Sequence, residues 1–347
     1  MGPLSKAEDA RWMAAALALG QRGRGRTASN PNVGCVVVKD GRVIGRGWTQ
    51  PGGRPHAEAM ALAQAGAESR GATLYVTLEP CAHVSERGPA CSDLIVEAGV
   101  ARVVASVEDP DPRTAGRGFA RLRAAGIDVV TGVRADEAEE SFAGFVARQR
   151  FGRPHVTLKH ATSLDGRIAL PDGTSRWITG EAARAHAHLE RSRHEAILIG
   201  RGTWEADRPR LDVRLEGLEG RSPLRVILTS RPLVSSEVEK RSSTEHALLD
   251  YARSERDVVC ISSPPEIATL PCDHLLVEGG AETAAAFLRA DRVDRLLIYR
   301  APILIGAGKS AIWDIGLIDL ADAHGRWRLV DARQLGSDRF EAYLRRR

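Results

Sequence analysis

Strand-like and helix-like segments alternate along the first 150 residues of this chain, and this order restricts the folds that the chain can adopt. ATLYVTLEP has the composition of a buried strand that stops at Pro80, and ARVVASVED follows it after the helix-like segment ACSDLIVEAG. Ahead of them, VGCVVVKDGRVIGRGW is typical of two strands joined by a turn at Asp40 and Gly41. Strands that alternate with helices predict an α/β layer in which helices cover a sheet.

The 347 residues are more than one hydrophobic core usually holds, so we expect two domains. RADEAEESFAGFVARQR predicts one helix that closes the first domain, and FGRPH provides a joint after it, so we place the domains at 1–151 and 152–347. HEAILIG, PLRVILTS and RDVVCISS indicate the strands of a second, buried sheet. The polar stretch 235–257 predicts an exposed helix, and RLLIYR and RFEAYLRRR predict edge strands.

The charge and the cysteines exclude several classes of protein. The formal net charge of +4 is too small to indicate a nucleic-acid partner by itself, and it fits an anionic small molecule equally well. No secretory signal opens the chain and no apolar run is long enough to span a membrane, so we expect a soluble cytoplasmic protein with reduced thiols and no membrane partner. Of the five cysteines, Cys81 and Cys91 are the pair to test as metal ligands, whereas Cys35 and Cys260 lie in apolar runs and are expected in the core.

Two short motifs in the first domain contain metal-ligating residue types. His56 and Glu58 stand at the start of a predicted helix, Cys81 follows a predicted strand, and Cys91 opens the next helix. The carboxyl ends of parallel strands are where sites form in α/β sheets. One histidine and two thiolates bind zinc and leave its fourth position open, as in a catalytic site. The alternative is that His56 and Glu58 only form a polar helix start and that the two cysteines are incidental. That alternative would suffice for His56 and Glu58 alone, but it does not explain why Pro-Cys and a second cysteine follow them.

Glu58 indicates which chemistry this site performs. Zinc lowers the pKa of a bound water from about 15.7 to roughly 7, and a neighbouring carboxylate can pass the released proton to a ring nitrogen and a leaving amine. Zinc nucleobase deaminases use this arrangement of His-x-Glu, Pro-Cys and a further Cys. The residues therefore predict hydrolytic deamination of an amino-heterocycle.

TASNPNVGCVVVKDGRVIGRG, HAEAMALAQAG, TLEPCAH and EDPDPRTAGRGFARLRAAGIDV resemble the deaminase half of the bifunctional deaminase/reductase family of riboflavin biosynthesis. The resemblance extends over nearly all of the first domain and implies a cytidine-deaminase-like α/β/α fold. It implies these roles: zinc ligands His56, Cys81 and Cys91, proton donor Glu58, and substrate contacts Asn30 and His83.

The loop between the two cysteines departs from the family pattern. CAHVSERGPAC has nine residues between Cys81 and Cys91, one more than the family usually has and far more than nucleic-acid deaminases have. A longer loop can still close on zinc, because the entropy of loop closure grows slowly with length. The departure leaves open whether His83 and Arg87 keep the register of the family's substrate contacts.

VTLKHATSLDGRIALPDGTSRWITG, RSRHEAILIGRGTWEADRPRLDVR and LLVEGGAETAAAFLRADRVDRLLIYRAPILIG resemble the reductase half of the same family. The resemblance implies a dihydrofolate-reductase-like α/β fold that uses NADPH. It assigns these residues to the NADPH site: Ala161, Trp177, Thr203, Asp207, Ser230 and Gly280. It assigns these to the substrate site: Ser175, Arg191, Leu211, Arg214 and Glu278. The planar donors of Arg191 and Arg214 suit a ribose phosphate.

The resemblance implies two consecutive reactions on one phosphorylated pyrimidine. The first is zinc-dependent deamination of 2,5-diamino-6-ribosylamino-4(3H)-pyrimidinone 5′-phosphate. The second is NADPH-dependent reduction of the ribosyl group to ribityl, which gives 5-amino-6-ribitylaminouracil 5′-phosphate, and we expect a homo-oligomer. Two alternatives are a tRNA or nucleobase deaminase with an appended binding domain, and a non-catalytic zinc scaffold. The long loop and modest charge argue against the first, and Glu58 argues against the second.

Overall fold

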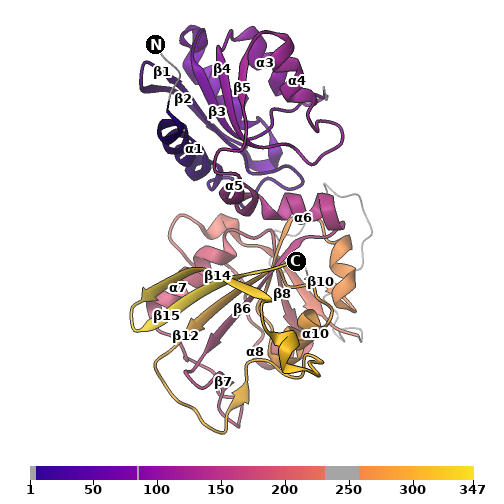
Figure 1. Cartoon of the computed structure of the whole chain (residues 1–347). Coiled ribbons are helices and arrows are strands. Elements are labelled where there is room, and N and C mark those ends of the chain that lie inside the picture. Colours follow the sequence, from indigo (N-terminus) through magenta and orange to yellow (C-terminus); the bar gives the residue numbers. More distant parts are fainter. Residues whose placement is uncertain (1–4, 84–85, 231–257) are drawn as a thin grey trace. The chain divides into compact units, whose positions relative to one another are not determined.

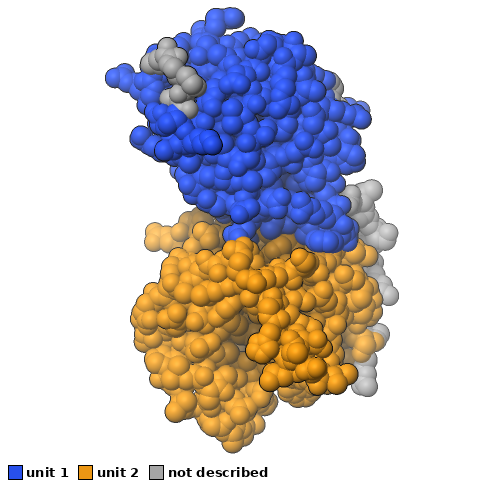
Figure 2. All heavy atoms as spheres, in the orientation of Figure 1, with its two compact units in different colours: residues 1–152 blue, residues 153–347 orange. Residues whose placement is uncertain are grey.

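The computed structural model describes residues 5–83, 86–230 and 258–347. The chain divides into two compact units, residues 1–152 and 153–347 (Figures 1 and 2). The sequence places this boundary one residue earlier. Both units are mixed α/β structures with a sheet of their own, which confirms the predicted fold class.

The first unit is built on a five-stranded sheet in the order β2-β1-β3-β4-β5. β1 pairs antiparallel with both β2 and β3, whereas β3, β4 and β5 run parallel. The carboxyl ends of these parallel strands therefore lie at one edge of the sheet, where loops can build a site. The strands are β1 (Gly34–Lys39), β2 (Arg42–Trp48), β3 (Thr73–Leu78), β4 (Arg102–Val107) and β5 (Asp128–Val130).

Helices lie on both faces of this sheet, and the buried apolar residues between helices and sheet form one core. α1 and α5 contact each other and the strands on one face, while α2, α3 and α4 contact one another in sequence (Figure 1). The helices are α1 (Lys6–Gly20), α2 (Ala57–Ala65), α3 (Cys91–Glu97), α4 (Arg117–Ala124), α5 (Ala135–Ser141) and α6 (Ala143–Phe151), with 3-10 turns at Pro51–Gly53 and Gly66–Ser69.

The single helix predicted at the end of the first domain is wrong, because the structure has two helices there. Phe142 stands between α5 and α6 with φ −116° and ψ 35°, which is outside the helical region. Its side chain is fully buried. The break between the two helices thus coincides with a buried aromatic ring. Hydrophobic periodicity alone does not reveal this break.

The second unit contains an eight-stranded sheet in the order β10-β9-β8-β11-β6-β12-β15-β14. The first six of these strands run parallel, and β15 and β14 complete the sheet with antiparallel pairing. The strands are β6 (His155–Thr162), β8 (Ala196–Gly200), β9 (Leu224–Leu228), β10 (Val258–Ile261), β11 (His274–Val277), β12 (Arg295–Arg300), β14 (Trp327–Leu335) and β15 (Asp338–Arg345), and β7 (Arg167–Ala169) pairs separately with β13 (Lys309–Ser310).

Helices stand in the connections between the parallel strands: α7 precedes β8, α8 lies between β8 and β9, and α10 lies between β11 and β12. α8 contacts β8 and β9, and α10 contacts β8. The helices are α7 (Glu181–Arg191), α8 (Arg201–Asp207) and α10 (Ala281–Arg289), with 3-10 turns at Glu219–Arg221, Pro264–Thr269 and Leu320–Ala323. No helix within the described ranges is long and apolar enough to cross a membrane.

Three expectations for the second unit need correction or lie outside the described ranges. β12 and β15 are interior strands rather than edge strands, because β14, which the sequence did not predict, pairs beyond β15. Cys260 is exposed rather than in the core, because its strand β10 forms the other edge of the sheet. The exposed helix expected at 235–257 lies outside the residues that the structure describes.

Candidate active sites

Three element ends bring the predicted ligands of the first unit together. His56 is the N-cap residue of α2, Cys81 follows β3, and Cys91 is the first residue of α3. The Nδ1 atom of His56 lies 3.6 Å from Sγ of Cys81 and 3.3 Å from Sγ of Cys91. All three ligand atoms lie within 4.8 Å of one another, and we call these three residues the ligand cluster.

The ligand cluster fits a zinc ion. Bonds of about 2.3 Å to sulfur and about 2.0 Å to nitrogen hold tetrahedral zinc ligands roughly 3.5 Å apart, close to the distances observed here. Within the described ranges, no other group of three His, Cys, Asp or Glu residues has this geometry. Three protein ligands leave one tetrahedral position open for water or substrate.

The nine-residue loop closes through hydrogen bonds between its two ends. The backbone N–H of Cys91 donates to Sγ of Cys81 at 3.3 Å. The N–H and the hydroxyl of Ser92 donate to the carbonyl oxygen of Cys81 at 3.1 and 3.0 Å. The hydrogen bonds with Cys91, together with His56, outweigh burial and lower the pKa of Cys81 to about 4, which favours the thiolate form that binds zinc.

Glu58 lies in the first turn of α2 and is only 3% exposed. Its carboxyl group forms a hydrogen bond with the side chain of Cys91. Burial raises the pKa of Glu58 to about 7, against a smaller lowering by His56. A carboxyl group with a pKa near neutrality can both accept and release a proton, and Glu58 has this property beside the ligand cluster.

Asn30 reaches the loop that precedes His56. Its side-chain amide packs against Gly53 so closely that a Cβ atom at that glycine would overlap it. Arg87 meets the same loop, since its guanidinium donates to the carbonyl oxygen of Gly52 at 2.6 Å. The structure thus brings both side chains to the segment that enters α2.

The loop between β4 and α4 also approaches the ligand cluster, and the sequence analysis did not assign it a role. Buried Glu79 accepts hydrogen bonds from three of its backbone N–H groups, at 3.2, 2.9 and 3.1 Å: those of Asp109, Gly116 and Phe119. His83 faces this loop, with Nδ1 3.4 Å from the hydroxyl oxygen of Thr114. The available signal was EDPDPR directly after β4, at the carboxyl end of a parallel strand.

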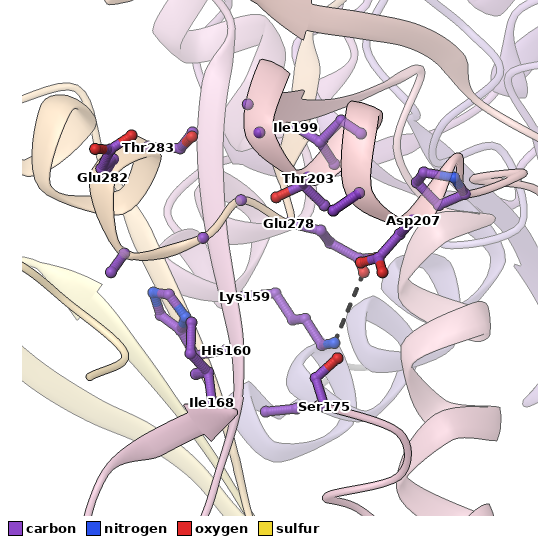
Figure 3. Close-up of a pocket in the computed structure, with 18 of the residues that line it drawn as sticks. Lys159, His160, Ile168, Ser175, Ile199, Thr203, Asp207, Glu278, Glu282 and Thr283 are labelled. Atoms are coloured by element: carbon purple, nitrogen blue, oxygen red, sulfur yellow. Dashed lines mark ion pairs between the residues drawn. The ribbon is translucent and has the colours of Figure 1, made fainter. Parts of the chain in front are cut away.

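The second unit contains a cavity of about 1540 Å³ beside the carboxyl ends of β6, β8, β9 and β11 (Figure 3). Pockets for one small ligand usually measure about 300–1,000 Å³, so this cavity has room for a cofactor and a substrate together. Its lining includes every residue that the sequence assigns to the second site: Ala161, Ser175, Trp177, Arg191, Thr203, Asp207, Leu211, Arg214, Ser230, Glu278 and Gly280.

A buried group of charges lies at one wall of this cavity. Nε and Nη2 of Arg191 donate to the two carboxylate oxygens of Glu278 at 2.8 and 2.9 Å. The ammonium of Lys159 lies 3.7 Å from the same carboxylate (Figure 3). Burial alone raises the pKa of Glu278, but Arg191 and Lys159 outweigh it and hold the pKa well below its usual value. Lys159 was missed because a single lysine in a strand has no distinctive sequence pattern.

Gly280, which the resemblance assigns to the NADPH site, follows Gly279 and is the N-cap residue of α10. A Cβ atom at Gly279 would overlap the side chain of Thr283, so the chain passes here only without a side chain. Trp177 is 66% exposed, and the guanidinium of Arg184 lies 4.7 Å from its ring centre. The first turn of α10 and this flat ring both line the cavity.

Comparisons with known proteins agree with this arrangement over the whole chain. The family model described as RibD C-terminal domain matches residues 154–340, and the model described as cytidine and deoxycytidylate deaminase zinc-binding region matches residues 6–107. The Riboflavin biosynthesis protein RibD of Escherichia coli is 40% identical, over 95% of this chain and 98% of its own, and that of Aquifex aeolicus is 37% identical, over 95% and 96%.

Solved structures give the same result. Acinetobacter baumannii RibD superposes with a TM-score of 0.84 at 36% identity, and the alignment covers 99% of this chain and 100% of that one. A diaminohydroxyphosphoribosylaminopyrimidine deaminase/5-amino-6-(5-phosphoribosylamino)uracil reductase from Thermotoga maritima has a TM-score of 0.84 at 32% identity, over 98% and 99% of the two chains.

Proposed function

This chain belongs to the RibD family of riboflavin biosynthesis proteins, and on that basis we propose how its own residues carry out the family's two reactions. It is a bifunctional deaminase and reductase that uses zinc and NADPH. We assign the deaminase to 1–151 and the reductase to 152–347. The observation that carries the proposal is the ligand cluster with buried Glu58 beside it.

In the first unit, His56, Cys81 and Cys91 would hold the zinc ion. When bound, zinc supplies a Lewis acid that makes a water molecule acidic enough to attack the ring carbon that bears the 2-amino group of the diaminopyrimidine. Glu58 transfers the two protons of that water in turn, the first to the adjacent ring nitrogen and the second, released as the ring carbonyl forms, to the departing amine, so that ammonia leaves. Asn30 and His83 hold the pyrimidine through hydrogen bonds.

In the second unit, NADPH supplies a hydride to the anomeric carbon of the ribosyl group. One proton must reach the ring oxygen as the bond between that carbon and oxygen opens, which gives the ribityl chain. Arg191 and Lys159 keep Glu278 charged, and the ammonium of Lys159 holds a proton at the cavity wall. We assign the remaining predicted residues to the positioning of NADPH and substrate, since the nicotinamide carries the hydride chemistry.

A coupled assay tests both assignments in one sample. Purified protein with bound zinc is given 2,5-diamino-6-ribosylamino-4(3H)-pyrimidinone 5′-phosphate, and ammonia release and NADPH absorbance are followed in turn. We expect ammonia first, and NADPH oxidation only after deaminated product has formed. NADPH oxidation without ammonia release, or ammonia release from RNA instead of the pyrimidine, would contradict the proposal.

We also propose that the protein is a homo-oligomer in the cytoplasm, with no nucleic-acid or membrane partner. Support for self-association comes from large apolar side chains that are exposed between β12 and β14, among them Leu304, Ile318 and Leu320. A second copy would cover such a surface at low cost, because burying apolar area is favourable. Light scattering after size-exclusion chromatography tests this, and a monomer mass at all concentrations would contradict it.

A further inference from the structure

His188 lines the cavity of the second unit beside two arginines, and neither the motifs nor the proposed reaction gives it a role. It lies on α7, three residues before Arg191. Its Nδ1 atom is 3.2 Å from the backbone nitrogen of Arg214 and 3.2 Å from the carbonyl oxygen of Asp212. Its Nε2 atom is 3.2 Å from Nη2 of Arg214. The ring therefore touches the backbone and the guanidinium of the same residue.

Both ring nitrogens of His188 face donors of Arg214, and Nδ1 also faces an acceptor, the carbonyl oxygen of Asp212. A backbone N–H and a guanidinium can only donate, whereas a neutral imidazole has a single acceptor nitrogen. When the ring is protonated, Nδ1 donates to the carbonyl oxygen of Asp212, and Nε2 meets the guanidinium of Arg214 as a second donor across 3.2 Å. Two donors that converge this closely are satisfied together by one anionic oxygen between them.

Of the two arginines, Arg214 is the one open to a ligand. The side chain of Arg191 is 15% exposed, forms the paired bonds with Glu278, and donates through Nη1 to the carbonyl oxygen of Asp212 at 3.1 Å. The side chain of Arg214 is 52% exposed, and its Nη1 lies 3.6 Å from the carboxylate of Asp212. An incoming anion therefore meets Arg214 and His188 before it meets Arg191.

We propose that His188 and Arg214 together bind the 5′-phosphate of the reductase substrate, with Nε2 of His188 donating directly to a phosphate oxygen. This inference rests on the proposed reductase function of the cavity. A phosphate monoester is the shared chemistry of the substrate and of the 2′-phosphate of NADPH, so the test has to separate these two sources.

The charges around His188 make this contact depend on pH. Burial lowers the pKa of His188, Arg191 and Arg214 lower it further, and Glu278 and the hydrogen bond to Asp212 oppose them. A bound phosphate dianion offsets the two guanidinium charges, so it raises the pKa of His188 and binding takes up a proton. The protonated ring donates through Nδ1 to Asp212 and through Nε2 to the phosphate. Affinity should therefore increase as the pH falls toward the usual histidine range.

The test measures NADPH-dependent reduction of 5-amino-6-(5-phosphoribosylamino)uracil by the wild-type enzyme and by His188→Ala and His188→Gln. We expect His188→Ala to raise the KM for this substrate about tenfold with kcat within about twofold, as the loss of one charge-assisted hydrogen bond predicts. His188→Gln keeps a donor but cannot be protonated. Its KM should exceed that of wild type about twofold at a pH of about 8 and about tenfold at a pH of about 6.5. The ratio to wild type cancels titration of the substrate phosphate itself, whose pKa is about 6.

Two further KM values separate the sources of phosphate. With phosphatase-treated substrate, and for NADPH, we expect His188→Ala to equal wild type. An increase in the KM for NADPH alone would assign the contact to the cofactor and overturn the proposal. Equal increases for phosphorylated and dephosphorylated substrate would show that His188 only shapes the cavity, and would overturn it as well.

His324→Ala is the matched control, because it removes an exposed imidazole that does not line the cavity. Ammonia release by the first unit and the thermal unfolding midpoint show whether each variant is folded. A wild-type enzyme that fails to reduce the phosphorylated substrate would defeat the proposed function. Reduction by wild type together with an unchanged KM in His188→Ala would defeat only this inference.

Discussion

The two sites differ in how their residues are distributed, and the difference predicts how each responds to substitution. The ligand cluster and Glu58 lie between residues 56 and 91 and meet around one point. The cavity of the second unit draws its lining from residues 159–314. A site that depends on a few atoms loses nearly all activity when one is removed, whereas a site that distributes binding over many contacts loses it by degrees. Three predictions at the two sites test this contrast, and a fourth concerns the stability of the second unit.

The largest effect is expected at Glu58. Replacement by glutamine keeps the size of the side chain but removes the group that moves protons, so we expect Glu58→Gln to lower the deamination rate about 10³-fold. Zinc content by atomic absorption should remain at one ion per chain. Ammonia release measures the loss, and reduction of supplied deaminated substrate should continue at the wild-type rate.

Glu68→Gln is the control for that substitution, because Glu68 is exposed outside the ligand cluster. It should release ammonia at the wild-type rate. If Glu58→Gln deaminated as fast as this control, Glu58 would not be the proton shuttle, and the site would not depend on so few atoms.

Substitution of Glu278 should cause a smaller loss of reductase activity, together with a loss of stability of the second unit. Glu278→Gln leaves Arg191 and Lys159 without their carboxylate in a buried place. We expect kcat/KM for reduction to fall about 10²-fold and the free energy of unfolding of the second unit to fall by about 3 kcal/mol. Enzyme assays and urea unfolding measure both, with exposed Glu216→Gln as a control that changes neither. Full reductase activity in Glu278→Gln would place the chemistry elsewhere in the cavity.

Asp294 should make the free energy of unfolding of the second unit depend on pH in the acid range. Arg153 donates to its two oxygens at 2.6 and 2.9 Å, and Val156 N–H donates at 2.9 Å. Burial raises the pKa of Asp294, but these hydrogen bonds and nearby positive charges outweigh it and lower the pKa from 3.8 to about 2.

Because the folded pKa is the lower one, this stabilisation is complete above a pH of about 4 and is lost as the pH falls through about 2. It amounts to about 2 kcal/mol. Urea unfolding between these values, in wild type and in Asp294→Asn, measures it. The difference between the two proteins should shrink as the pH falls, and a constant difference would show that the carboxylate does not titrate with unfolding.

The smallest effect is expected at Gly279, which has no side chain and lines the cavity with its backbone alone. A methyl group there would overlap Thr283, so Gly279→Ala should displace the start of α10 and weaken NADPH binding about tenfold. Calorimetry with NADPH measures this. Gly220→Ala, at a position with open space, should bind NADPH like wild type. Equal affinities in the two variants would show that the glycine pair does not shape the cofactor site.

The sequence was most informative where the chemistry depends on residues close together along the chain. His56, Glu58, Cys81 and Cys91 stand at the ends of elements that periodicity already indicates, so their spacing and residue types were enough to predict the ligand cluster. Glu79 was not found, because its partners are backbone N–H groups of a loop about 30 residues further on, and backbone donors leave no trace in the residue types.

Sheet edges and the cavity were predicted less well. Every residue of β14 is exposed or half-buried and these positions do not alternate regularly, and a bulge interrupts its pairing with β15, so the sequence lacks the strand pattern that would have revealed it. Cys260 was placed in the core because an apolar run does not tell an edge strand from a central one. Lys159 and His188 gain their roles only from strands and helices that fold against them, so no local pattern could single them out.

Glu79 holds the loop 109–119 by the loop's backbone and not by its side chains. Exposed side chains of that loop, such as those of Pro112 and Arg113, can therefore be exchanged without loss of its anchor, whereas those of Asp109, Asp111 and Thr114 are buried. Gly118 is an exception, since a Cβ atom there would overlap the carbonyl oxygen of Pro80. A library that varies Pro110, Pro112 and Arg113 and keeps Glu79, Asp111 and Gly118 would alter the surface of the loop that His83 faces while its backbone anchor stays in place, which makes this loop a starting point for redirecting the deaminase to other amino-heterocycles.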